Sequence, residues 1–361
     1  MNVKIALAAA LFHLFTSVSY GQGFAGLGIE GDDYAQVTPG KAFDYPKDHG
    51  AHPDFRIEWW YVTANLKDEA GIQYGVQWTL FRQAMTPPPQ LDGWRSQQVW
   101  LGHAALSSPG IHLSGETVAR GLTGQAGVTT GPLAAWIDDW SLTSIASANT
   151  DALSSITLKA STADFSYALT LNTDKNLIFH GQSGVSTKSE LGQSSYYYSQ
   201  PFYDVSGALN VSGVDINVSG KAWLDREWSS QPLSTTQSGW DWFSIHLDNG
   251  DKVMLFRLRD TAADDYYSGT WISKSGNTET LPPESISFVE LKRTGARDVD
   301  VPTQWRLEVP SKKLDIETTA LNEDSWMDTS IRYWEGPINV SGSHNGVGYL
   351  EMTGYDNSES K

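Results

Sequence analysis

Cysteine is absent from the 361-residue chain. Disulfide bonds, thiolate chemistry and cysteine-ligated metals are therefore excluded. Basic residues are also scarce, with 25 Lys and Arg against 42 Asp and Glu, which gives a formal net charge of −17. A surface of this sign repels nucleic acids and anionic lipids, so we expect no nucleic-acid partner.

The motifs of several enzyme classes are missing as well. The sequence contains no Gly-x-Ser-x-Gly nucleophile turn, no phosphate-binding glycine loop and no dinucleotide-binding fingerprint. Its 8 histidines do not fall at chelating intervals with an acid nearby. We therefore expect neither a metal site nor a cofactor.

Long apolar runs are confined to the first twenty positions. Residues 1–21 carry one lysine, then an apolar stretch, then the small residues Ser19 and Gly21. This is the pattern of a cleaved secretory signal peptide, and its apolar core is too short for a membrane span. We expect an exported protein, periplasmic or secreted, without stable membrane insertion. The sequence indicates no particular export or transport partner.

Aromatic and small residues are abundant. The chain has 15 Trp, 15 Tyr, 12 Phe and 33 Gly, a composition typical of many short strands joined by tight turns. Apolar and polar side chains alternate clearly within several of the candidate strands. The sequence predicts an all-β protein, with strands before residue 231 near positions 58–66, 73–82, 97–106, 134–142, 155–162, 165–171, 178–185, 194–200, 203–211 and 214–225.

The second half of the chain repeats the first. Trp240–Arg257 parallels Trp59–Arg82: each has paired aromatics, a strand, a glycine turn and a strand that ends in Leu-Phe-Arg. Each half therefore begins with an aromatic hairpin and ends with a similar closing strand. This arrangement is expected of antiparallel barrels, in which the first and last strands meet.

The closing strand of each half carries an acid. The segment that begins at Gly346 parallels the one at Gly220, which places Glu351 on Asp225. If the first and last strands of each barrel meet, Trp60 lies near Asp225 and Trp242 lies near Glu351. We divide the chain into a signal peptide (1–21), an extended arm (22–47), a first barrel (48–230), a linker (231–238) and a second barrel (239–357).

The stretch Gly220–Leu233 is the strongest candidate for chemistry. In a strand, Trp223, Asp225 and Glu227 share one face. Aromatic neighbours desolvate a carboxylate and raise its pKa, as a general acid near neutral pH requires. The alternative is that Asp225 or Glu227 pairs with a cation such as Arg226 and only fixes the strand register.

Other residues qualify as candidates, each with a structural alternative. His103 lies in an apolar strand with small neighbours, which suits a general base or a hydrogen-bonded core residue. Glu58 needs a partner if buried, with Arg56 or Arg82 available. The remaining aromatic candidates could contact an apolar ligand or fill a barrel core: Trp60, Trp78, Tyr196, Tyr198, Trp223 and Trp242.

Five motifs together resemble one known family. They are HPDFRIEWWYVTANL, HAAL at His103, SYYYSQP at Ser195, AWLDREWSSQPL and GWDWFSIHLDNG. The chain from about residue 48 to residue 356 resembles the carotenoid 1,2-hydratase-like and AttH-like proteins, also called predicted secreted hydrolases. The resemblance implies two tandem lipocalin-like β-barrels.

The resemblance also implies a reaction. In the carotenoid hydratases an acid on the strand similar to AWLDREW protonates an isoprenoid double bond, and that position is Asp225 here. Trp223, Tyr196 and Tyr198 would stabilise the resulting cation through their π faces. A histidine that the hydratases carry near SYYYSQP is replaced here by tyrosine.

Two hypotheses follow. In one, the exported protein binds an apolar small molecule, isoprenoid or lipid-like, without a defined reaction, and Asp225 and Glu351 are matching structural acids. In the other it is a metal-independent hydratase-like lyase or isomerase, with Asp225 as general acid and Tyr198 and His103 beside it. The repeat slightly favours the first, because an acid present in both copies is easily explained as scaffold.

Overall fold

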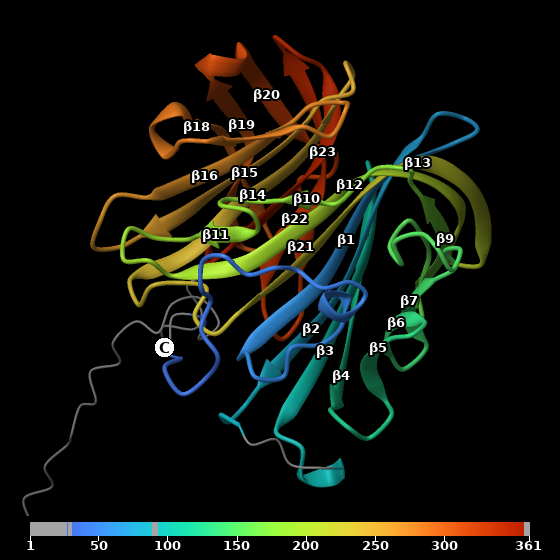
Figure 1. The fold of residues 1–361 in the computed structure, drawn as a ribbon. Helices are drawn as coiled ribbons and strands as arrows, with labels where there is room; N and C mark the ends of the chain where they lie inside the picture. The colour runs from blue at the N-terminus through green and yellow to red at the C-terminus, as the bar shows by residue number, and fades with distance from the viewer. Residues whose placement is uncertain (1–26, 28–30, 89–92, 357–361) are drawn as a thin grey trace, which may run out of the picture.

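The computed structural model describes residues 27, 31–88 and 93–356, so the predicted signal peptide lies outside the described residues. The described chain is all β with four short 3-10 turns, at Lys47–His49, Gly93–Arg95, Pro283–Ser285 and Pro310–Lys312. Among these residues no helix is long and apolar enough to cross a membrane. The strands form two antiparallel sheets that pack against each other (Figure 1).

The first sheet is a nearly closed barrel. Its strand order is β4-β3-β2-β1-β13-β12-β9-β8-β7-β6-β5, with β10 and β11 added along β12. The edge strand β4 lies against β6, which brings the two ends of the sheet together. The strands are β1 (Ile57–Asp68), β2 (Gln73–Ala84), β3 (Gln98–Ser108), β4 (Ile111–Arg120), β5 (Ala126–Thr130), β6 (Leu133–Ile137), β7 (Trp140–Ser144), β8 (Ser155–Ser161), β9 (Phe165–Asn172), β10 (Ile178–Phe179), β11 (Val185–Thr187), β12 (Ser194–Val211) and β13 (Val214–Ser229).

The second sheet is a half-barrel, in the order β17-β16-β15-β14-β23-β22-β20-β19-β18, with β21 paired to β22. The all-β fold with two lipocalin-like barrel domains is therefore confirmed, with the second barrel open. Its strands are β14 (Gln237–Leu247), β15 (Lys252–Asp260), β16 (Tyr266–Ile272), β17 (Thr278–Leu281), β18 (Ser287–Ala296), β19 (Val299–Val309), β20 (Leu314–Ala320), β21 (Trp326–Met327), β22 (Tyr333–Gly342) and β23 (Gly346–Thr353).

The first and last strands meet in both halves, as the repeat predicts. In the first half β1 pairs with β13, and Tyr61 lies opposite Asp225. In the second half β14 pairs with β23, and Trp242 lies opposite Glu351. The two acids thus occupy corresponding positions, each beside the opening strand of its own half.

A close backbone approach supports this correspondence. A Cβ added to Gly220 would meet the Asn65 carbonyl oxygen at 2.0 Å, and one added to Gly346 would meet the His246 carbonyl oxygen at 2.2 Å. Only glycine fits at either place. The predicted match of the two Leu-Phe-Arg segments holds within the hairpins, where Arg82 lies opposite Glu58 and Arg257 lies opposite Asp241. In that register Trp242 corresponds to Trp59, which faces Glu227, so the hairpins and the closing strands are offset by two residues.

Four strands predicted from the sequence have different limits in the structure. Residues 134–142 form a hairpin rather than one strand, because the chain turns at Asp138, whose φ is +53°. Residues 178–185 are interrupted by a turn between β10 and β11. Residues 194–211 are one strand, β12, in which a bulge between Gln200 and Tyr203 absorbs the expected break.

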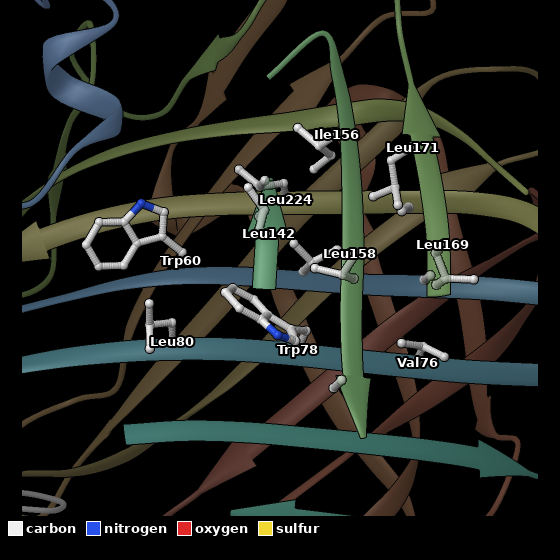
Figure 2. Packing of buried hydrophobic residues seen from close by; sticks show 14 of the residues in the cluster. Trp60, Val76, Trp78, Leu80, Leu142, Ile156, Leu158, Leu169, Leu171 and Leu224 are labelled. Atoms are coloured by element: carbon white, nitrogen blue, oxygen red, sulfur yellow. The ribbon is translucent and has the colours of Figure 1, made fainter. Parts of the chain in front are cut away.

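The interior of the first barrel is filled by apolar side chains from all its long strands. Trp60, Trp78 and Leu224 lie in this core with leucines from β7, β8 and β9 (Figure 2). The arm that precedes β1 closes one end. There the Trp60 indole donates a hydrogen bond to the His49 carbonyl oxygen at 2.9 Å, and the His49 ring bonds the Tyr198 hydroxyl at 2.7 Å.

Glu58 is the charged centre of this closed end. It is fully buried and forms ion pairs with Arg82 and Arg226, while the His52 backbone N–H donates to it at 2.8 Å. Burial alone would raise the pKa of Glu58, but the two guanidinium charges hold it well below its ordinary value. Of the two expected partners Arg82 is present, whereas Arg56 donates to the Leu27 carbonyl oxygen.

Replacing Glu58 by glutamine should lower the free energy of unfolding by about 3–5 kcal/mol, because two buried guanidinium groups lose their counter-charge. Urea denaturation measures this change. The control is Asp204→Asn, which removes an ion pair to Lys221 whose side chains are 76% and 55% exposed and should change little. Equal effects for the two variants would contradict this account of Glu58.

Candidate functional site

The outer faces of the two sheets line a partly open cavity of about 350 Å³. That volume lies within the range of small-molecule sites. The first sheet contributes wall residues from β1, β2, β3, β4, β12 and β13, and the second contributes them from β14, β15, β22 and β23. Residues outside the strands complete the wall: Leu27, Lys188, Pro232, Leu233, Ser330 and Ile331.

The two-residue period of β13 creates the polar part of this wall. Leu224 and Trp228 belong to the core of the first barrel, whereas Asp225 and Glu227 line the cavity. Trp223 shares their face and is buried behind them at the domain interface. The predicted common face of Trp223, Asp225 and Glu227 is confirmed.

Asp225 is held by three donors. The Tyr197 hydroxyl donates to Oδ2 at 2.8 Å, the Trp223 indole donates to Oδ1 at 2.6 Å, and the Ser199 hydroxyl also donates to Oδ1. Burial raises the pKa of Asp225 to about 7 in spite of these bonds, which lower it. The carboxyl group can therefore exist in both protonation states near neutral pH.

A second layer orients these donors. Burial lowers the pKa of His180 to about 3, so its ring is neutral at pH 7. Its Nε2 lies 2.6 Å from the Ser199 hydroxyl and its Nδ1 lies 2.9 Å from the Thr270 hydroxyl. Because Ser199 donates its proton to Asp225, we assign the ring proton to Nε2, which leaves Nδ1 to accept from Thr270.

Glu351 lies on the cavity wall contributed by the second sheet. The Trp240 indole donates to its Oε1. Burial raises the pKa of Glu351 to about 7, and the charges of Asp225 and Glu227 contribute to the increase. Two corresponding acids from the two halves of the chain therefore line one cavity, each with its pKa near neutrality.

Glu227 is the third acid on the wall and is paired. The Lys188 ammonium lies 2.8 Å from its Oε1, and the Ser195 hydroxyl donates to the same oxygen. Lys188 also lies 4.5 Å from the centre of the Phe256 ring, a cation–π contact. It is the single cation among the residues that line the cavity.

The rest of the wall is apolar and aromatic. Trp59, Tyr61, Trp240, Trp242 and Phe256 surround the acids. The rings of Tyr61 and Trp242, one from each sheet, meet edge to face at 5.5 Å. Among the described residues there is no cluster of three or more metal-ligating side chains.

The structure brings two of the nine sequence-predicted site residues, Asp225 and Trp242, to the cavity wall. Trp223 stands directly behind Asp225. His103 is buried beside the wall and bonds the Tyr333 hydroxyl, which lines it, at 2.8 Å.

The other five do not line this cavity. Glu58, Trp60, Trp78, Tyr196 and Tyr198 point into the first barrel or its closed end, because they occupy the opposite face of their strands. Tyr198 bonds His49, and Tyr196 accepts from the Thr38 backbone N–H at 2.9 Å.

Tyr197 is one of three phenols on the cavity wall that were not predicted from the sequence, with Tyr61 and Tyr333. Tyr197 lies opposite Glu227 and accepts a hydrogen bond from the Trp242 indole at 3.2 Å. Strand alternation already separates Tyr197 from Tyr196 and Tyr198. The missing information was the pairing of β12 with β13, which sets Tyr197 on the face of Asp225.

Comparison with known proteins settles the family. The model of the AttH-like family matches residues 36–355. The chain belongs to the AttH-like family. A solved AttH-type protein from Nitrosomonas europaea is 33% identical to this AttH-like chain, over 89% of this chain and 100% of the other, with a TM-score of 0.78.

More distant structures share the fold of the AttH-like chain. Kievitone hydratase from Nectria haematococca is 17% identical, over 89% of this chain and 96% of the other, with a TM-score of 0.68. CghA, solved with Sch210972, is 10% identical, over 83% of this chain and 89% of the other, with a TM-score of 0.53. No curated protein matches the sequence.

The raised pKa of Asp225 should make stability depend on pH. Between the ordinary pKa of 3.8 and the folded value of about 7, the folded state keeps a proton that the unfolded state releases. The contribution of Asp225 to the free energy of unfolding is therefore fully present below about pH 4 and is lost as the pH rises to about 7. Urea denaturation of wild type and Asp225→Asn from pH 4 to pH 8 should show their difference changing over this range. A difference independent of pH would contradict the assignment.

Proposed function

We propose that the protein binds an apolar small molecule, isoprenoid or lipid-like, between its two barrels, and that Asp225 transfers a proton to a carbon–carbon double bond of that molecule. One observation carries the proposal: a buried carboxyl group with a pKa near 7 lies on the wall of an aromatic, largely apolar cavity. A carboxyl group in such a place is the usual arrangement for a general acid at neutral pH.

The geometry suits both halves of a proton-transfer cycle. Protonated Asp225 gives its proton to one alkene carbon, and a carbocation forms at the other. The carboxylate that remains is stabilised by the donors Tyr197, Ser199 and Trp223. The π faces of Trp59 and Trp242 on the wall stabilise the cation.

The cycle closes in one of two ways. Water adds to the cation, and its surplus proton returns to the carboxylate, which gives net hydration of the double bond. Alternatively, the cation loses a proton from an adjacent carbon to the carboxylate, which gives an isomer or a cyclised product. Each outcome leaves Asp225 protonated again.

Two further points support the proposal. Asp225 occupies the position that the resemblance to carotenoid hydratases implies, and a protein named as a hydratase has the same fold. We also propose that the protein acts outside the cytoplasm, in the periplasm or after secretion, as the signal-peptide pattern of residues 1–21 suggests.

The second candidate is binding without chemistry. It is favoured by the complete hydrogen bonding of Asp225, since both carboxyl oxygens already have donors within the protein. In that case the protein carries the apolar molecule unchanged, and Asp225 fixes the positions of Tyr197 and Trp223.

Deuterium incorporation distinguishes the candidates. Geraniol, farnesol and squalene are incubated in D₂O with wild type or Asp225→Asn, and the extracts are analysed by mass spectrometry. Acid catalysis predicts carbon-bound deuterium with wild type and a rate at least about 100-fold lower with Asp225→Asn. Native mass spectrometry of the same mixtures reports binding.

The matched control is Asp204→Asn, the same change at an exposed site, which should turn over like wild type. If a probe binds but neither the wild type nor any variant incorporates deuterium into it, the result would favour binding without chemistry. The protein is also purified from its own host, and the lipids that copurify with it are extracted and tested in the same way. This adds the natural ligand to the panel.

A further inference from the structure

A line of buried polar groups crosses the interface between the two sheets, away from Asp225. On the outside, the Glu116 side chain is 24% exposed and accepts from the Ser330 backbone N–H at 3.0 Å. The His103 ring follows: its Nε2 lies 3.0 Å from Glu116 Oε1, and its Nδ1 lies 2.8 Å from the Tyr333 hydroxyl. His103 itself is completely buried.

The line continues to the cavity. The Tyr333 hydroxyl is close enough to Glu335 to lower the pKa of its carboxyl group, and the Tyr61 hydroxyl donates to Glu335 Oε1. Tyr61 interacts likewise with Glu351, which lies directly opposite Glu335 in the pairing of β22 with β23. The line runs from β4 and β3 of the first sheet to β22 of the second, back to β1 and then to β23, so it exists only because the halves are docked.

Glu335 is the unusual member. Its side chain is buried and its Oε2 has no hydrogen-bond partner. The Tyr61 hydroxyl bonds the other oxygen, Oε1. A buried carboxyl group with one unpartnered oxygen costs least when it is neutral, so Glu335 holds a proton at rest. Glu335 lies on β22 and not on the strand that carries Asp225. The reaction proposed at Asp225 does not explain why a carboxyl group is buried there.

We propose that Glu116, His103, Tyr333, Glu335 and Tyr61 form a proton path between solvent and Glu351, which makes Glu351 a second acid–base group of the cavity. The proposal rests on the proposed function, in which a bound apolar molecule keeps water from the wall. Under that condition a cavity carboxyl group can exchange protons with solvent only through the protein.

The transfers balance without a charged histidine. In the outward direction the His103 Nε2 proton moves to the Glu116 carboxylate, the Tyr333 hydroxyl proton moves to His103 Nδ1, and the Glu335 proton moves to the Tyr333 oxygen. Glu335 is left ionised, Glu116 protonated and His103 neutral in its other tautomer. Glu335 then recovers a proton from Glu351 through Tyr61, and the inward direction reverses every step.

The electrostatics agree with this assignment. Burial lowers the pKa of His103, so the ring is neutral at rest. Burial and the charge of Glu351 raise the pKa of Glu335 well above its ordinary value. The titratable groups around the two glutamates are Tyr61 from β1, Tyr333 from β22, Tyr349 from β23, Tyr167 from β9, and Asp225 and Glu227 from β13.

Hydrogen–deuterium exchange of the Glu335 carboxyl group tests the path without a ligand. Its C=O stretch shifts when COOH becomes COOD, and the band is assigned by its loss in Glu335→Gln. The background is Tyr61→Phe, which removes the hydroxyl that joins Glu335 to Glu351. In that background, His103→Phe or Glu116→Gln should slow exchange by at least about tenfold.

The control is His112→Phe, also in the Tyr61→Phe background. His112 is a neighbouring histidine that bonds Ser107 and lies off the path, so exchange should keep the rate of Tyr61→Phe alone. Glu116→Gln changes a partly exposed side chain, so it remains informative if His103→Phe fails to fold. Unchanged exchange in Glu116→Gln, or equal slowing by His112→Phe, would overturn the path and leave the proposed reaction at Asp225 untouched.

Discussion

The alternation of side chains along β13 is the constraint on which the site depends. One face of this strand must complete the apolar core of the first barrel, since Leu224 and Trp228 are fully buried there. The other face is then free to carry Trp223, Asp225 and Glu227, and it becomes buried only because the second sheet covers it. A shift of one residue would exchange the two faces and place the carboxylates in the core.

Desolvation and favourable interactions oppose each other at the buried acids Glu58, Asp225 and Glu351, and the balance differs from site to site. At Glu58 two guanidinium groups outweigh burial and the carboxylate stays ionised. At Asp225 three neutral donors do not, so burial prevails and the pKa rises. The difference is one of charge: neutral donors stabilise a carboxylate less than a paired cation does. A carboxyl group therefore stabilises the fold as an ion at Glu58 on β1, and can gain or lose a proton at Asp225 on the neighbouring strand β13.

The sequence predicts local features of this fold well. The β1–β2 hairpin and the shared face of Trp223, Asp225 and Glu227 follow directly from a two-residue period. The hairpin at Asp138 was not predicted because aspartate tolerates the left-handed region without glycine, which leaves a weak signal.

The site itself is harder to predict, because it depends on contacts that no local pattern encodes. Tyr198 and Tyr197 are adjacent in sequence and equally aromatic, yet only the pairing of β12 with β13 shows which one faces the acid. Glu335 and Tyr61 are 274 positions apart and meet only when the sheets dock. The repeat did identify Asp225 and Glu351 as counterparts, but it could not show that both face one cavity.

The docking of two stiff sheets through a shared wall has a mechanical consequence. Gly75 on β2 lets Pro337 of β22 approach so closely that a Cβ would lie 2.5 Å from its ring. The sheets are thus in firm contact beside the cavity, while other parts of the wall are formed by short connecting segments such as Pro232–Leu233. A side chain at position 75 would push the two sheets apart. The glycine therefore helps to set the spacing of the sheets, and with it the separation of Asp225 on β13 from Glu351 on β23.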